Sequence, residues 1–149
     1  MWSRCCARRI TTQTPTSQFF GYDIAPSVTK FWNAYEGQNI TFKLGDFLID
    51  NTYHYDLLLI LDVLEHLKNP FQFLQELRKH SDHFIFHIPL DLSALSVLIE
   101  SPLIKSRQKV GHIHYFTKKM AVSLLEECGF EVIESAYTGA ALSLQNMSL

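Results

Sequence analysis

The sequence predicts an α/β fold built on a Rossmann-like, mostly parallel sheet with helices on both faces. From Phe19 onward, segments with the two-residue period of strands alternate with segments of helical period, a pattern typical of βα units. The run Leu57–Leu61 is apolar at every position, as a central strand is when helices cover both faces of its sheet. Acidic residues follow three of the expected strands, where an open parallel sheet binds its ligand.

The first part of the pattern predicts two strands joined by a helix. A short buried strand is expected at Phe19–Ile24. The helix begins at Pro26, a residue that suits the first helical position, and Gly37 marks its end. Apolar residues alternate with polar ones over 40–44, which predicts a second strand that ends at Gly45.

The centre of the chain predicts a buried strand followed by two helix starts. The strand spans Tyr55–Leu61. Asp62 then stands where a cap for a short helical turn would stand, and Glu65 follows three residues later, the spacing of a capping box. Asn69 before Pro70 repeats the pattern for the next helix. We therefore expect Glu65 to serve mainly as a capping residue.

The remaining segments complete the predicted fold. His83–Leu90 alternates apolar and polar residues and predicts a strand, and Asp91 opens a helix. Residues 101–111 carry three basic side chains and are expected to form a loop. Thr117 caps a further helix, and residues 130–137 predict a final strand.

The composition is that of a soluble globular protein. The chain has 149 residues, a length typical of one domain; 47% of them are hydrophobic and the formal net charge is −2. The small charge gives no electrostatic case for a nucleic-acid partner, and no apolar run approaches the roughly 20 residues of a membrane span.

The cysteines and the N-terminal segment bear on the compartment. Cys5, Cys6 and Cys128 have neither a disulfide framework nor a zinc-ligand spacing, which favours reduced thiols in the cytoplasm. The first 18 residues contain basic and hydroxyl-bearing side chains and no acids, so a mitochondrial presequence is the alternative.

Acidic residues stand at the ends of three successive strands, at Asp23, Asp46 and Asp62. The carboxyl ends of parallel strands meet at one edge of a sheet, so these carboxylates are expected to line one site. There a carboxylate can accept hydrogen bonds from both hydroxyls of a ribose. Each acid could alternatively cap a helix or close a turn. Three in succession favour a ligand that contains a nucleoside.

Five stretches, in a fixed order, carry a resemblance to a known family. The strongest is "DLLLILDVLEHLKNP", and the second is "GHIHYFT" with "LLEECGFEV"; the others are "FFGYDIAPS", "ITFKLGDF" and "HFIFHIPL". Together, from Phe19 to Glu134, they resemble a class I S-adenosylmethionine-dependent methyltransferase. Within that family they are most similar to the ubiquinone- and menaquinone-type small-molecule enzymes.

The resemblance implies that residues 19–149 form a partial methyltransferase-like domain. Residues 1–18 are polar and aperiodic and are expected to be poorly ordered. It also implies that S-adenosyl-L-methionine is the cofactor. Asp23 would hold the ribose hydroxyls, with Ile24 beside the adenine. Asp46 and Phe47 would meet the adenine from the next strand end.

The resemblance further places Leu61 and Asp62 at the methionine end of the cofactor, near the sulfonium. The reaction would be in-line transfer of the methyl group from sulfur to an acceptor atom. The sulfonium is already a good leaving group, so the protein would mainly position the reactants and exclude water. A general base is needed only if the acceptor must lose a proton.

One family motif is missing from the sequence. The family has an apolar first strand that runs into a glycine-rich turn, and no two of the six glycines here stand two positions apart. The pattern in this chain begins at the family's second strand. The missing strand lies at the centre of the family's sheet, so we expect a gap that leaves two strand edges without a partner.

Histidines supply the candidate catalytic residues, His66 and His112, although satisfied structural histidines are the alternative. Glu65 and His66 are adjacent, and neighbours on a helix do not face each other, so no acid–base pair is expected. The chain has no HExxH motif, and no metal site is expected.

Two functions from different classes follow from these observations. The first is methyl transfer from S-adenosylmethionine to a small-molecule acceptor. The alternative is a non-catalytic, truncated module of the methyltransferase fold that binds or oligomerises. The missing strand motivates the alternative, and its open strand edges would favour a homodimer.

Overall fold

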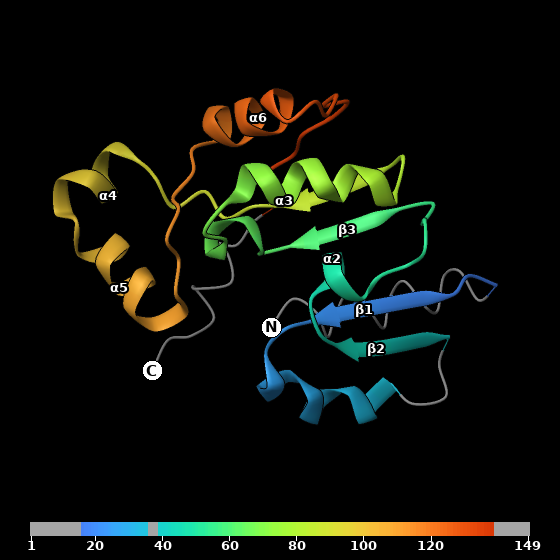
Figure 1. The fold of residues 1–149 in the computed structure, drawn as a ribbon. Coiled ribbons are helices and arrows are strands. Elements are labelled where there is room, and N and C mark those ends of the chain that lie inside the picture. The colour runs from blue at the N-terminus through green and yellow to red at the C-terminus, as the bar shows by residue number, and fades with distance from the viewer. Residues whose placement is uncertain (1–15, 36–38, 139–149) are drawn as a thin grey trace.

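The computed structural model describes residues 16–35 and 39–138, in which helices surround two pairs of parallel strands (Figure 1). In the first pair, β1 (Phe19–Asp23) lies beside β2 (Ile40–Leu44), with Phe19 opposite Ile40. They are connected through η1 (Pro26–Tyr35), which begins at the expected proline but is a 3-10 helix. The expected helix end, Gly37, lies outside the described residues.

The second pair is β3 (Leu58–Leu61) and β4 (Phe84–His87), which also run parallel. Between them come η2 (Leu64–His66), α3 (Pro70–Leu77) and η3 (Arg78–His80). As predicted, Asn69 caps α3, because its side-chain oxygen accepts a hydrogen bond from the Gln72 amide at 3.2 Å. The strand β3 is shorter than predicted, since Tyr55 makes only an isolated bridge to Ser81.

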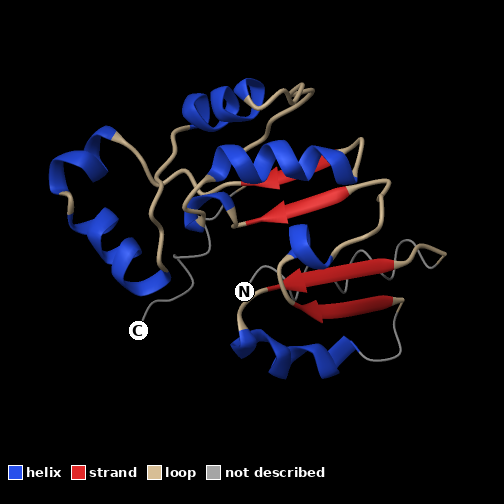
Figure 2. Ribbon diagram, viewed as in Figure 1, coloured by secondary structure: helices blue, strands red, loops and turns tan. Residues whose placement is uncertain are grey.

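The two pairs are separate sheets within the described part of the chain. Among the described residues no strand pairs with the free edge of β1 or of β3. The expected gap stays a prediction, because the N-terminal residues that could fill it lie outside the described ranges. The arrowheads of β1, β2 and β3 nevertheless point the same way in Figures 1 and 2. All strand pairing is parallel, so the predicted α/β class is confirmed.

Aromatic rings pack β1 against the segments that follow β2. Phe20 of β1 stacks on Tyr53 with ring centroids 6.0 Å apart, and Tyr22 meets Phe47 edge-on at 5.1 Å. Phe47 begins α2 (Phe47–Asp50), a single-turn helix that the sequence pattern did not predict.

The C-terminal part of the chain is helical, with α4 (Ala94–Ile99), α5 (Ser101–Val110) and α6 (Lys118–Glu127). The predicted loop at 101–111 is wrong: α5 begins at Ser101 with Pro102 in its first turn, and left-handed Gly111 (φ 80°) ends it. Helix α4 is capped by Ser93, so Asp91 does not open it. The predicted final strand is also wrong, because residues 130–137 pair with no described strand and Ile133 is 89% exposed.

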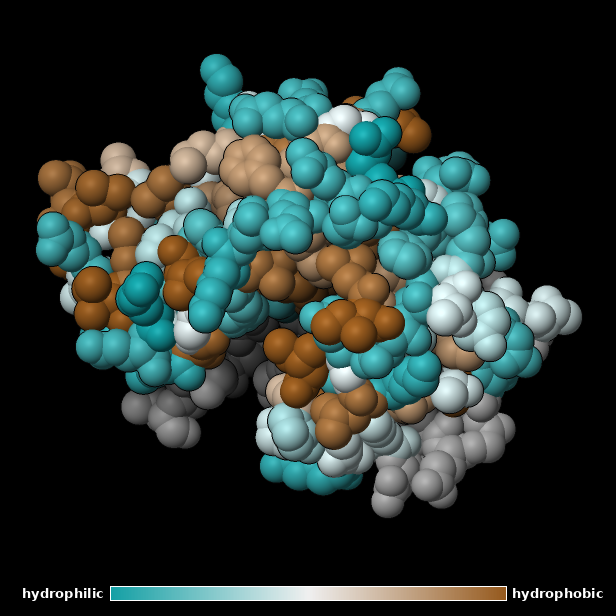
Figure 3. All heavy atoms as spheres, in the orientation of Figure 1, coloured by the Kyte–Doolittle hydropathy of each residue, from teal (hydrophilic) through white to brown (hydrophobic). Residues whose placement is uncertain are grey.

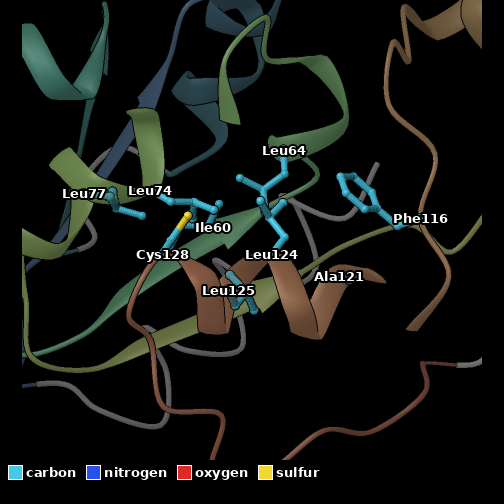
Figure 4. Packing of buried hydrophobic residues seen from close by; sticks show 9 residues of the cluster. All are labelled: Ile60, Leu64, Leu74, Leu77, Phe116, Ala121, Leu124, Leu125 and Cys128. Carbon is cyan, nitrogen blue, oxygen red and sulfur yellow. The ribbon is translucent and has the colours of Figure 1, made fainter. Parts of the chain in front are cut away.

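The hydrophobic core lies between β3, α3 and α6, as Figure 4 shows. Thr117 caps α6 as predicted, and three residues of this helix, Ala121, Leu124 and Leu125, are buried. Among the residues whose burial is described, the buried hydrophobic ones are Ile60, Leu64, Leu74, Leu77, Phe116, Ala121, Leu124, Leu125 and Cys128. This core fixes β3 and η2, which carry the central residues of the candidate site.

Apolar side chains are exposed at the end of the molecule formed by α4 (Figure 3). Leu98 is 82% exposed and Leu95 is 65% exposed. No helix within the described ranges is long and apolar enough to cross a membrane.

Candidate functional site

The first two predicted cofactor residues, Asp23 and Asp46, lie at the carboxyl ends of β1 and β2 and are exposed. One oxygen of Asp23 accepts a hydrogen bond from the Ala25 amide at 2.8 Å. One oxygen of Asp46 accepts from the Leu48 amide at 2.9 Å and caps α2. Both acids therefore have the turn-forming role that was expected from the sequence as the alternative. They also stand at the carboxyl ends of their strands, where open parallel sheets generally bind ligands.

Asp62 follows β3 in a left-handed conformation, with φ 53°. The predicted capping box is wrong, because η2 begins after Val63 and has no side-chain cap. Asp62 instead places Oδ1 at 2.6 Å from His87 Nδ1, at the end of β4. Asp tolerates a positive φ better than most residues, and such strain persists only where the surroundings hold it.

The apolar cofactor candidates occupy the same edge. Ile24 follows β1 and is 74% exposed, and Phe47 is half-buried at the start of α2. Leu61 is the last residue of β3 and is half-buried. Their contacts with a cofactor remain predictions.

The most unusual side chain is Glu65, on η2. Its side chain is 1% exposed, and neither carboxylate oxygen has a hydrogen-bond partner among the described residues. Desolvation raises the pKa of Glu65 above its ordinary value, and the charge of Asp62 raises it further. Its own backbone amide and the imidazoles of His66 and His112 lower this pKa, but by less.

Two imidazole nitrogens face the buried carboxylate. His66 Nε2 lies 3.7 Å from Glu65 Oε1, and His112 Nε2 lies 3.9 Å from the same oxygen. The expectation that Glu65 and His66 do not face each other is thus wrong. The reason is that η2 is a single 3-10 turn in which His66 Nδ1 donates to the Gly111 carbonyl at 3.2 Å, turning Nε2 toward Glu65.

The loop after α5 carries His112 to this place and is fixed there by backbone hydrogen bonds. The amides of Ile113 and His114 both donate to the Glu65 carbonyl, at 2.8 and 3.1 Å. His112 Nδ1 lies 2.9 Å from Asp91 Oδ2 and 2.9 Å from Ser106 Oγ. The structure thus brings together both catalytic candidates, which are 46 positions apart in the sequence.

Sequence reasoning missed Glu65, Asp91 and Ser106 as members of this cluster. The segments "DVLEHL" and "GHIHYFT" were the two strongest blocks of the resemblance, and they meet here. That the two blocks touch could not be predicted from a pattern of single residues.

A groove of about 650 Å³ lies elsewhere, between the starts of α3 and α6. It is lined by Lys68, Asn69, Pro70, Phe71, His114, Phe116, Thr117, Lys119, Met120, Ser123, Leu124 and Glu127. None of the predicted cofactor residues is among them, so the groove does not mark the expected cofactor site.

One family model, described as a methyltransferase domain, matches residues 4–135. The match covers most of the chain and begins before Phe19, where the resemblance noted in the sequence starts. None of the curated proteins compared with the chain matches it.

Proposed function

The chain belongs to the methyltransferase-domain family, and on this premise we propose that it transfers a methyl group from S-adenosyl-L-methionine to a small-molecule acceptor. The observation that carries the proposal is the family match over residues 4–135. The placement of carboxylates at the ends of parallel strands supports it, because ligands of such sheets bind at this edge.

The residues at the strand ends suit the adenosine part of the cofactor. Asp23 and Asp46 are exposed acceptors, as ribose hydroxyls and an adenine amine require, and Ile24 offers an exposed apolar side chain. Leu61 ends β3 and Asp62 follows it, and both would lie beside the methionine part. The cofactor supplies an activated methyl group, and the protein's own work is to position the acceptor and exclude water.

An acceptor that must lose a proton needs a base near the methyl group. His112 is oriented through Nδ1 by Asp91, and its Nε2 faces the inside of the cluster. His66 faces the same point and is 38% exposed. These two histidines are the proton acceptors that the geometry offers.

The cofactor test is calorimetric titration of the full chain with S-adenosylmethionine and with S-adenosylhomocysteine. Asp23→Asn and Asp46→Asn keep the turn and the cap, because an amide oxygen accepts the same backbone hydrogen bonds. They remove the charge that strengthens hydrogen bonds to the ligand. Each is expected to weaken binding roughly 10- to 100-fold, the equivalent of about 1.5–3 kcal/mol.

Asp82→Asn is the matched control, since Asp82 is also exposed but precedes β4, at the opposite edge of the strands. This variant is expected to bind as the parent chain does. The proposal is refuted by the absence of both heat and a thermal shift with either ligand. An equal loss of affinity in all three variants would refute the assigned binding edge.

A non-catalytic module is the second candidate. The observation that favours it is the separation of the two strand pairs, which leaves one edge each of β1 and β3 without a described partner. Light scattering together with the calorimetric titration distinguishes the two. A dimer that binds neither ligand supports the module, whereas a chain that binds the cofactor supports the enzyme.

A further inference from the structure

We infer that Glu65, His66 and His112 form a binding site for a divalent first-row transition metal, with Zn²⁺ as the best-suited ion. One ligand atom from each residue lies within 4.8 Å of the other two. The sequence predicted no metal here because the three residues have no recognisable spacing. The inference concerns metal binding itself and does not require the proposed methyl transfer.

The distances suit a shared ion. Two ligand atoms bound tetrahedrally to one Zn²⁺ at its usual bond lengths are about 3.4 Å apart. The two imidazole nitrogens lie 3.7 and 3.9 Å from Glu65 Oε1. These separations exceed a hydrogen bond but are only a few tenths of an ångström wider than shared coordination requires.

The buried carboxylate points independently to a ligand. Glu65 is fully buried, and neither of its oxygens is hydrogen-bonded within the described chain. Burying a polar group without a partner is costly, and buried carboxylates are normally paired or coordinate a metal. A dication between this oxygen and the two imidazoles would supply the missing partner.

The hydrogen bonds on the far side of each ring define its tautomer. The Gly111 carbonyl can only accept, so His66 Nδ1 carries a proton, and the Asp91 carboxylate requires the same of His112. With Nδ1 protonated in each ring, Nε2 is the ring atom that can offer a lone pair to a ligand beside Glu65. A metal-bound histidine typically donates its other N–H to a carboxylate or backbone carbonyl, which is the arrangement here.

The kind of ion follows from the ligands. Two imidazoles and one carboxylate favour Zn²⁺ and its transition-metal neighbours, whereas Mg²⁺ and Ca²⁺ prefer oxygen ligands. Three protein ligands leave one coordination position open, and the partly exposed ring of His66 lies at the solvent side of the cluster. With an ion bound, both Nε2 atoms would be metal ligands and not proton acceptors. If methyl transfer is the function, an acceptor oxygen bound at the open position would then release its proton more readily, and to solvent.

The test is calorimetric titration of the full chain, first stripped with a chelator, with Zn²⁺. One Zn²⁺ per chain is expected to bind. Asp91→Asn is expected to weaken binding roughly 10- to 100-fold, as loss of an outer partner does, and Glu65→Gln and His112→Ala to weaken it more. His83→Ala is the control, because His83 is exposed and lies outside the cluster, and it is expected to leave affinity unchanged.

X-ray absorption of the zinc-loaded parent chain keeps the inference testable if a variant fails to fold. Only nitrogen and oxygen neighbours are expected at about 2.0–2.2 Å, with imidazole scattering. Sulfur neighbours would assign the metal to cysteines and overturn the inference. Failure to bind Zn²⁺, or equal affinity in the parent chain and in folded Glu65→Gln, would overturn it as well.

Discussion

The two strand pairs of the molecule are stabilised in different ways. The nine buried hydrophobic residues of the described ranges all lie in the half that contains β3 and β4, between Ile60 and Cys128. Within residues 16–35 and 39–50, which contain β1 and β2, no residue with a described side chain is buried. The β1–β2 half depends instead on aromatic contacts with Tyr53 and Tyr55.

This difference separates the two candidate sites by rigidity. The cluster of Glu65, His66 and His112 is attached to the packed core through η2 and through the hydrogen bonds of residues 113 and 114. The proposed adenosine-binding acids, Asp23 and Asp46, lie in the half without a core. Elements with few buried apolar contacts open at lower free energy, so the adenosine side is expected to be the more adaptable.

The largest expected effect on stability comes from removing a core side chain in the β3–β4 half. Leu74 is fully buried against β3, and Leu74→Ala is expected to lower the free energy of unfolding by roughly 2–5 kcal/mol. Leu44→Ala in β2, where the side chain is 46% exposed, should cost less than about 1 kcal/mol. Denaturant unfolding measures both, and equal losses would contradict the difference between the halves.

A second change tests how the halves are joined. The side chain of Asn51 is hydrogen-bonded to the backbone of Tyr53, to the Tyr55 hydroxyl and to His80. Asn51→Ala leaves these groups without a partner and is expected to cost about 1–3 kcal/mol.

The readout for this change is the fluorescence of Trp32, which stacks on Phe42 in the β1–β2 half. A Trp2→Phe background makes Trp32 the only tryptophan of the chain. If Asn51 joins the halves, the Trp32 transition shifts to lower denaturant than the far-ultraviolet dichroism of the whole chain. Two transitions that stay coincident and unshifted would show that Asn51 contributes little to the junction.

The smallest expected effect is a pH dependence of the free energy of unfolding, which arises from Glu65 in the β3–β4 half. Burial raises the pKa of Glu65 in the folded chain above its ordinary value of 4.5. Below 4.5 the carboxyl is protonated in both states. As the pH rises toward the folded-state pKa, only the unfolded chain releases the proton, so stability falls.

Glu65→Gln removes the titrating carboxyl group. The free energy of unfolding of this variant should therefore change less with pH above 4.5 than that of the parent chain. The measurement is denaturant unfolding across the acidic range with a chelator present, so that no metal contributes. Glu76→Gln is the control, because Glu76 is about half exposed and its ion pair is with Lys79 at the surface. Parallel curves for the parent chain and Glu65→Gln would contradict the raised pKa.

Much of the fold could be predicted because local signals agreed with it. The Asn69-Pro70 start of α3 and the Thr117 cap of α6 are side-chain to backbone contacts within three residues, and both were predicted. The strands could be located because their periodicity is local as well. The helix α5 was missed because its basic residues suggested a loop, although Pro102 and Gly111 are ordinary start and stop signals.

The candidate site could be predicted only in part, because its contacts are not local. The strand-end acids followed from strand order, and the capping role of Glu65 was inferred from a spacing of three. The left-handed backbone at Asp62 removes that cap and sends its carboxylate to His87. The meeting of Glu65 with His112 depends on how α4 and α5 return the chain to η2, which no periodicity encodes.

The single carbonyl of Glu65 accepts hydrogen bonds from two successive amides, those of Ile113 and His114. These two hydrogen bonds attach the segment that contains α4 and α5 to the core. Movement of this segment away from the core would break both hydrogen bonds and would separate His112 from Glu65. Local unfolding of the α4–α5 segment therefore also takes apart the cluster of Glu65, His66 and His112.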